Sequence, residues 1–98
     1  MIRREGHSAI VETSLTLKTA AQASELGVAA INDGATEFDL SKVDEVDSSG
    51  LAVLFSWIRA AAARSVAVRF LAIPDQLRSL ADVYDVAEVL TGHLATDA

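Results

Sequence analysis

The sequence predicts an α/β fold in which a small mixed sheet of about four strands carries helices mainly on one face. The main observation is that stretches with strand periodicity alternate with stretches of helical periodicity, in the order β, α, β, α, β, α. A second observation is length, because 98 residues build one domain and can cover only one face of such a sheet fully. A third is composition, since a hydrophobic content of 51% supports a packed core and argues against disorder.

Three stretches have the features of strands. The first is weak, begins at residue 9 and extends toward Leu17. The second covers residues 36–40, where the apolar and acidic side chains alternate. The third covers residues 66–73, is rich in β-branched and aromatic residues, and ends before Pro74. Strands that alternate with helical stretches indicate a mixed or parallel sheet with helices packed against it.

The helical stretches have recognisable starts and stops. Residues 19–32 form the first, with Thr19 as candidate N-cap, although Gly27 lowers its helix propensity by roughly 1 kcal/mol. The second runs from a capping Ser48 or Ser49 to about residue 64. The third follows Pro74, and its apolar stripe consists of Leu77, Leu80, Ala81 and Tyr84. A short apolar element over residues 86–90 ends the chain.

Composition and charge exclude several classes of function. The chain has no cysteine, so it has no disulfide framework, thiolate metal site or cysteine nucleophile. The net charge of −6 argues against nucleic-acid binding and against docking on anionic lipid. Residues 1–7 are not followed by the apolar segment of a secretory signal, and no apolar run is long enough to insert into a membrane. The expected location is therefore the cytoplasm.

The run Val-Asp-Ser-Ser-Gly-Leu over residues 46–51 is the centre of the functional prediction. It lies between an expected strand and an expected helix, so Ser48 and Ser49 stand where backbone N–H groups are unpaired and the helix dipole is positive. A phosphate on Ser48 would be stabilised there. Gly50 leaves room for close approach of a partner. The simpler interpretation is that the two serines only cap the helix.

This run also carries a family resemblance. Residues 38–43, followed by residues 46–54, resemble the core of a STAS domain, and anti-sigma-factor antagonists carry the same Asp-Ser-Ser-Gly-Leu run. The resemblance implies a single STAS domain over residues 1–98. In sporulation-type antagonists the phosphorylated residue maps onto Ser48. In MlaB-type proteins a threonine is usual at that position, so Ser48 keeps only the hydroxyl.

The segment 77–86 resembles the MlaB pattern, in which a tyrosine, here Tyr84, closes a Leu-Ala-x-x-Tyr helix. This resemblance implies a cytoplasmic subunit, peripheral on the inner membrane, that binds the ATPase of an ABC-type phospholipid transporter together with its permease. The transporter would maintain outer-membrane lipid asymmetry. The alternative is an anti-sigma-factor antagonist that binds a serine-kinase anti-sigma factor and is switched by phosphorylation of Ser48.

The second helix offers further candidate contacts. Val53 and Trp57 form an apolar stripe beside its main core-facing side, and a tryptophan on such a stripe is a common interface anchor. The alternative is a broad core stripe, with Trp57 buried. Tyr84 is likewise either a core residue or a contact. The predicted partner-binding set is thus Ser48, Ser49, Gly50, Val53, Trp57 and Tyr84.

No residues of the chain form a recognisable catalytic set. Ser49 is not in a Gly-x-Ser-x-Gly elbow, neither histidine is placed for a triad, and no phosphate-binding P-loop is present. The acidic run at residues 44–47 lacks the ligand spacing of a calcium loop. We therefore expect a binding protein that is not an enzyme and has no cofactor and no metal.

Overall fold

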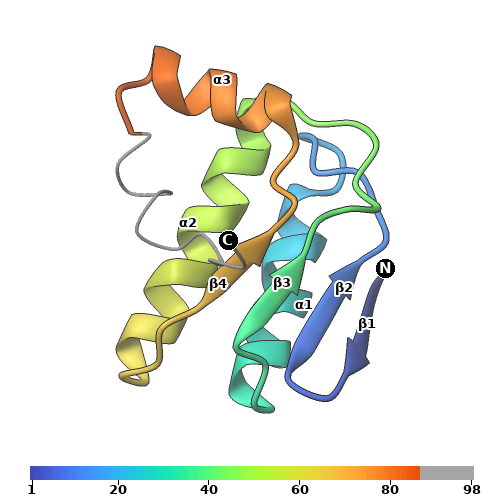
Figure 1. Cartoon of the computed structure of the whole chain (residues 1–98), viewed down its shortest axis with the longest axis vertical. Coiled ribbons are helices and arrows are strands. Elements are labelled where there is room, and N and C mark those ends of the chain that lie inside the picture. The colour runs from blue at the N-terminus through green and yellow to red at the C-terminus, as the bar shows by residue number, and fades with distance from the viewer. Residues whose placement is uncertain (87–98) are drawn as a thin grey trace.

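Four strands form one mixed sheet in the computed structural model, which describes residues 1–86. They are β1 (Ile2–Glu5), β2 (Ser8–Val11), β3 (Glu37–Asp39) and β4 (Arg69–Leu71), and they lie side by side in that order (Figure 1). β1 is antiparallel to β2, whereas β2 pairs with β3 and β3 with β4 in parallel. The expected small mixed sheet of about four strands is confirmed.

β1 departs from the expected element order, which began with the strand at residue 9. Its sequence, Ile-Arg-Arg-Glu, has one apolar residue and alternates half-buried and exposed positions, so it carries almost no strand signal of its own. Pairing with β2 through a two-residue turn at Gly6 and His7 creates it, with Gly6 at a φ of 61° that favours glycine. β1 therefore depends on its neighbour in the sheet.

The first expected strand is also shorter than predicted. β2 ends at Val11, and residues 12–19 form a loop that leads to the first helix. Only one bridge, between Leu15 and Val46, continues the parallel pairing beyond the strands. We call residues 12–19 the first loop and residues 40–47, which follow β3, the second loop.

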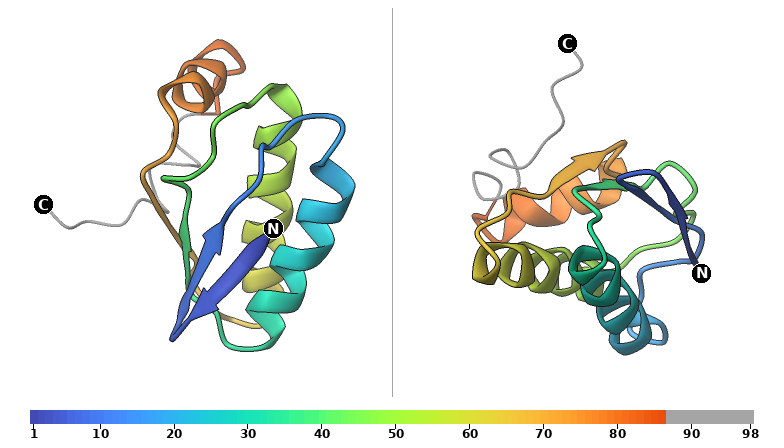
Figure 2. Two further views of the ribbon diagram at one scale, coloured as in Figure 1. Left: turned by 90° about the vertical axis from the view of Figure 1, so that its right-hand side faces the viewer. Right: turned by 90° about the horizontal axis from the view of Figure 1, so that it is seen from below.

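Three helices complete the described fold: α1 (Ala20–Asn32), α2 (Ser48–Ala63) and α3 (Asp75–Val83). α1 and α2 lie together on one face of the sheet, and α3 lies beyond the end of the sheet where α2 begins (Figures 1 and 2). This arrangement confirms helices mainly on one face. Apart from its first residue, the short element expected over residues 86–90 lies outside the described residues.

The core is centred on stacked aromatic rings between the sheet and α2. Trp57 stacks on Phe38 with ring centroids 4.2 Å apart and ring planes 10° apart, and Phe38 meets Phe70 at 6.1 Å. Gly27 of α1 makes room for the indole, because an added Cβ would lie 1.9 Å from Trp57 Nε1. The glycine that weakens the helix signal in the sequence is thus a packing requirement.

Within residues 1–86, no helix has the length and apolar character needed to cross a membrane. The fold leaves the start of α2 beside the first loop, at the end of the sheet opposite the β1–β2 turn (Figure 1).

Candidate functional site

Asp47, and not Ser48 or Ser49, caps α2. Its backbone is extended, with φ −141° and ψ −170°, and its side-chain Oδ1 accepts a 2.8 Å hydrogen bond from the Ser49 N–H. The prediction that a serine caps the helix is therefore wrong by one or two residues. The physical reason is that the helix already begins at Ser48, so the residue before it takes the cap and its negative charge meets the positive end of the helix dipole.

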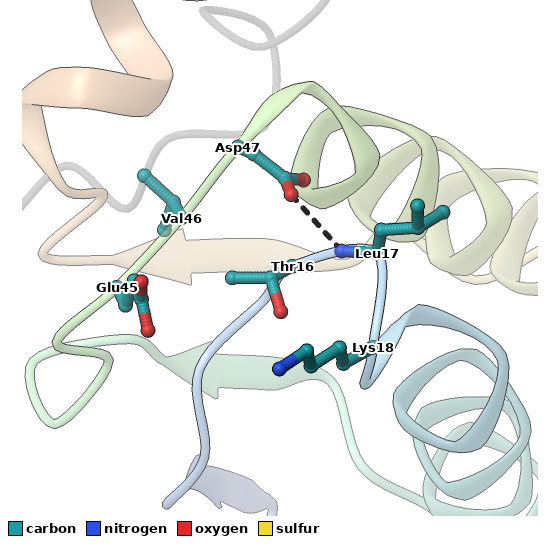
Figure 3. A pocket seen from close by; sticks show the side chains of 6 residues that line it. All are labelled: Thr16, Leu17, Lys18, Glu45, Val46 and Asp47. Atoms are coloured by element: carbon teal, nitrogen blue, oxygen red, sulfur yellow. Dashed lines mark hydrogen bonds between the residues drawn. The ribbon is translucent and has the colours of Figure 1, made fainter.

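The second carboxylate oxygen of Asp47 binds the first loop. Asp47 Oδ2 accepts a 3.0 Å hydrogen bond from the Leu17 N–H, shown as the dashed line in Figure 3. This bond is the main cause that lowers the pKa of Asp47; partial burial raises the pKa, and hydrogen bonds from Ser49 lower it further. One carboxylate thus joins the start of α2 to a loop thirty residues earlier in the chain.

Backbone hydrogen bonds reinforce this connection between the two loops. The Leu15 N–H donates to Glu45 O at 2.9 Å, and the Asp47 N–H donates to Leu15 O at 3.2 Å. Leu15 itself is fully buried and anchors the first loop in the core. The two loops are therefore held in a fixed register at the start of α2.

An open cavity of about 330 Å³ lies between the loops. Its lining consists of Thr16, Leu17, Lys18, Glu45, Val46 and Asp47 (Figure 3). The polar groups that line it are one hydroxyl, one ammonium and two carboxylates. No group of three histidine, aspartate or glutamate side chains suited to a metal ion occurs in the part of the chain that the structure describes. Side chains of this kind can form hydrogen bonds and ion pairs with a protein surface.

Ser48 is exposed at the first residue of α2, and its side chain takes no part in the cap. Ser49 is half-buried. Gly50 is buried, and a Cβ added there would lie 3.0 Å from both Leu15 O and Leu77 Cδ2. Gly50 therefore serves close packing inside the molecule, and the structure does not place it on a partner-binding surface.

The structure also moves two of the predicted contacts into the core. Val53 is 1% exposed and Trp57 is 0% exposed, so neither can contact a partner without unfolding. The indole N–H of Trp57 donates to Ser24 O at 3.3 Å, which satisfies its polar group inside the fold. The core alternative for Trp57 is the one observed, because α1 covers the second apolar stripe of α2.

Tyr84 is 56% exposed and lies at the C-cap of α3. It is available for contact but does not belong to the two loops or to their cavity. Ser48 and Tyr84 are therefore the two exposed members of the predicted set.

Leu17 is the surface residue that the sequence did not reveal. Its side chain is 79% exposed, the highest value among the large hydrophobic residues within residues 1–86. In the sequence, Leu15 and Leu17 alternate with polar residues and so extend the strand pattern. One sequence signal does point to the loop. The candidate N-cap at Thr19 places Leu17 outside the first helix, in the segment that connects the strand to it.

Comparison with known proteins shows to which family the chain belongs. A family model described as the MlaB STAS domain matches residues 2–92. The chain belongs to the STAS domain family. A search of curated protein sequences finds no significant match.

Solved structures share the STAS fold at low sequence identity. The anti-sigma factor antagonist SpoIIAA in its unphosphorylated form superposes with a TM-score of 0.61 at 17% identity, over 82% of this chain and 78% of SpoIIAA. A putative anti-sigma factor antagonist from Thermotoga maritima gives 0.63 at 14% identity, over 95% and 92% of the two chains. A sulfate transporter family protein from Wolinella succinogenes gives 0.65 at 13% identity, over 94% and 79%. At such identities the likeness establishes the fold alone.

Proposed function

We propose that this STAS domain is the MlaB-type subunit of an ABC-type phospholipid transporter and that it binds the ATPase. The observation that carries the proposal is the family match, which names the MlaB type and covers residues 2–92. The subunit is one non-catalytic domain over residues 1–98 that stabilises or regulates the ATPase. It lies in the cytoplasm, peripheral on the inner membrane through the complex with the permease, and it supports outer-membrane lipid asymmetry.

The contact surface is the start of α2 with the two loops beside it. Ser48 is exposed there, and the Asp47 carboxylate accepts hydrogen bonds from the Ser49 N–H of α2 and from the Leu17 N–H of the first loop. A pre-ordered surface loses little conformational entropy on binding, which favours association. The subunit shifts the conformational equilibrium of the ATPase only by its difference in affinity for the two ATPase states.

Titration calorimetry of the purified chain with the purified phospholipid-transporter ABC ATPase of the same organism tests this proposal. The wild-type chain binds, and Ser48→Glu weakens binding about tenfold or more because it places a charge on the contact surface. Ala63→Glu is the matched control, since it adds the same charge to an exposed residue at the other end of α2.

Two results would count against the proposal. Absence of binding by the wild-type chain would remove the transporter assignment. Equal affinity of Ser48→Glu and Ala63→Glu would remove the start of α2 from the interface.

A second candidate is an anti-sigma-factor antagonist switched by phosphorylation of Ser48. The observation that favours it is the exposed Ser48 side chain at the first residue of α2, in a fold shared with the anti-sigma factor antagonist SpoIIAA. A phosphate adds about −1.5 to −2 charges and bulk, and so releases a bound serine-kinase anti-sigma factor.

Isolation of the chain from its native cell with mass spectrometry separates the two candidates. An ABC ATPase with its permease supports the transporter subunit. A serine kinase together with phosphate on Ser48 supports the antagonist, and Ser48→Ala then keeps the kinase bound.

A further inference from the structure

The side chain of Leu17 is apolar but lies at the surface, so it contributes little burial energy to the isolated domain. It is 79% exposed, although Leu15 two residues before is fully buried. A single exposed leucine is common on protein surfaces and needs no explanation by itself. Leu17 differs from an ordinary exposed leucine because hydrogen bonds fix the backbone of its loop.

The backbone around Leu17 is fixed on both sides by hydrogen bonds. The Leu17 N–H donates to Asp47 Oδ2 at 3.0 Å. The Thr19 hydroxyl donates to Ser14 O at 2.6 Å and accepts from the Thr16 N–H at 3.0 Å. An exposed apolar side chain on a pinned backbone loses little entropy when it enters a pocket, which is the property of an interface anchor.

The surroundings of Leu17 indicate the chemistry of the partner. In Figure 3 the Leu17 side chain points away from Lys18, so it projects from the loop beside the cavity. The two loops together carry four carboxylates, those of Glu12, Asp44, Glu45 and Asp47, against two ammonium groups, those of Lys18 and Lys42, so their net charge is −2. The complementary surface is an apolar pocket for one leucine side chain, bordered by basic residues.

We propose that Leu17 is the apolar anchor by which this chain docks into a basic-rimmed pocket of its ATPase partner, and that Asp47 is the positioning residue that holds the anchor in place. The inference rests on the proposed function and adds to it the residue that supplies binding energy. Leu17 acts by entering the partner. Asp47 acts through Leu17, because the same carboxylate that caps α2 fixes the Leu17 amide.

The first test compares two leucine variants in calorimetry with the same purified ABC ATPase. Leu17→Ala weakens binding by about tenfold to a hundredfold, because the apolar area that the pocket would cover is lost. Leu26→Ala is the matched control on α1, where the leucine is 36% exposed, and it changes affinity by less than about twofold.

The outcomes separate this inference from the proposed function. If the wild-type chain binds and Leu17→Ala binds equally well, the anchor is overturned while the proposed function stands. If the wild-type chain does not bind the ATPase, both are overturned. If sedimentation shows that the wild-type chain forms dimers which Leu17→Ala abolishes, Leu17 is a contact between two copies and the ATPase anchor is likewise overturned.

The second test asks whether Asp47 acts through Leu17. Asp47→Asn keeps one acceptor oxygen for the helix cap but presents an NH2 group in place of the second oxygen, so it cannot accept both hydrogen bonds. We expect faster hydrogen exchange at the Leu17 amide and weaker ATPase binding. The double variant Leu17→Ala with Asp47→Asn binds no more weakly than Leu17→Ala alone. Additive losses in the double variant, or an unchanged Leu17 exchange rate in Asp47→Asn, would refute the positioning role.

Discussion

The first residue of α2 and the middle of α2 contrast sharply although they belong to one continuous helix. At its start, Asp47 and Ser48 lie at the surface, and hydrogen bonds to the first loop fix the backbone. In its middle, Val53 and Trp57 are buried, and Trp57 packs between Gly27 of α1 and Phe38 of the sheet. The difference teaches that a neighbouring helix can cover the second apolar stripe of a helix in an α/β domain. The residues that stay free for contact with a partner then lie at the end of the helix.

The largest expected effect comes from a change in the buried middle of α2. Trp57→Ala removes the ring stacked on Phe38 and leaves a cavity against Gly27, so we expect a loss of about 3–5 kcal/mol in the free energy of unfolding. Urea denaturation followed by circular dichroism measures it. Tyr84→Ala, at an exposed aromatic residue, is the control and costs about 0.5 kcal/mol or less. Equal losses in the two variants would contradict the core position of Trp57.

Gly27→Ala tests the same packing from the side of α1. Helix propensity alone favours alanine by about 1 kcal/mol. The added Cβ, however, would lie 1.9 Å from Trp57 Nε1, and overpacking of this kind costs about 1–3 kcal/mol. We therefore expect net destabilisation in the wild-type background. In the Trp57→Ala background the same substitution should stabilise the protein, since the clash is gone; destabilisation in both backgrounds would argue against the packing explanation.

Asp47→Ala addresses the exposed half of the comparison. It removes the cap of α2 and the bond to Leu17, so we expect the melting temperature to fall by several degrees at neutral pH. Folding lowers the pKa of Asp47 below its ordinary value of 3.8. The stabilisation by its carboxylate is therefore complete above that value and is lost as the pH falls through the folded-state pKa.

Thermal unfolding between neutral and acidic pH checks the sign of this effect. The gap between the wild-type chain and Asp47→Ala should narrow as the pH is lowered. Asp44→Ala, at an exposed position of the same loop, controls for the loss of one negative charge. A gap that widens toward low pH would contradict the hydrogen-bond origin of the shift.

The smallest effect on stability is expected for Ser48→Ala. The serine is exposed and Asp47 provides the cap, so the free energy of unfolding should change by no more than about 0.5 kcal/mol. Chemical denaturation measures this change. A larger loss would mean that Ser48 supports the helix, as the capping interpretation of the sequence held, and would weaken the case for a binding role.

Much of the fold could be predicted because the spacing of apolar residues within each segment indicates a helix or a strand. Periodicity located α1, β3, α2, β4 and α3, with the main differences at their ends. β1 could not be predicted, since Ile-Arg-Arg-Glu becomes a strand only through pairing with β2. The site was predicted in part: the Asp-Ser-Ser-Gly run marks the correct helix start, but Leu17 joins it through a hydrogen bond between residues thirty positions apart.

The sequence by itself determined the order of helices and strands from β2 onward, the STAS resemblance and the position of a serine at the start of α2, because each depends on neighbouring residues. Tertiary structure decided which apolar residues are free. Trp57 is buried because α1 offers Gly27 to receive its ring, and Leu17 is exposed on a loop whose backbone donates a hydrogen bond to Asp47. Burial depends on what packs opposite a side chain, and that partner lies elsewhere in the chain.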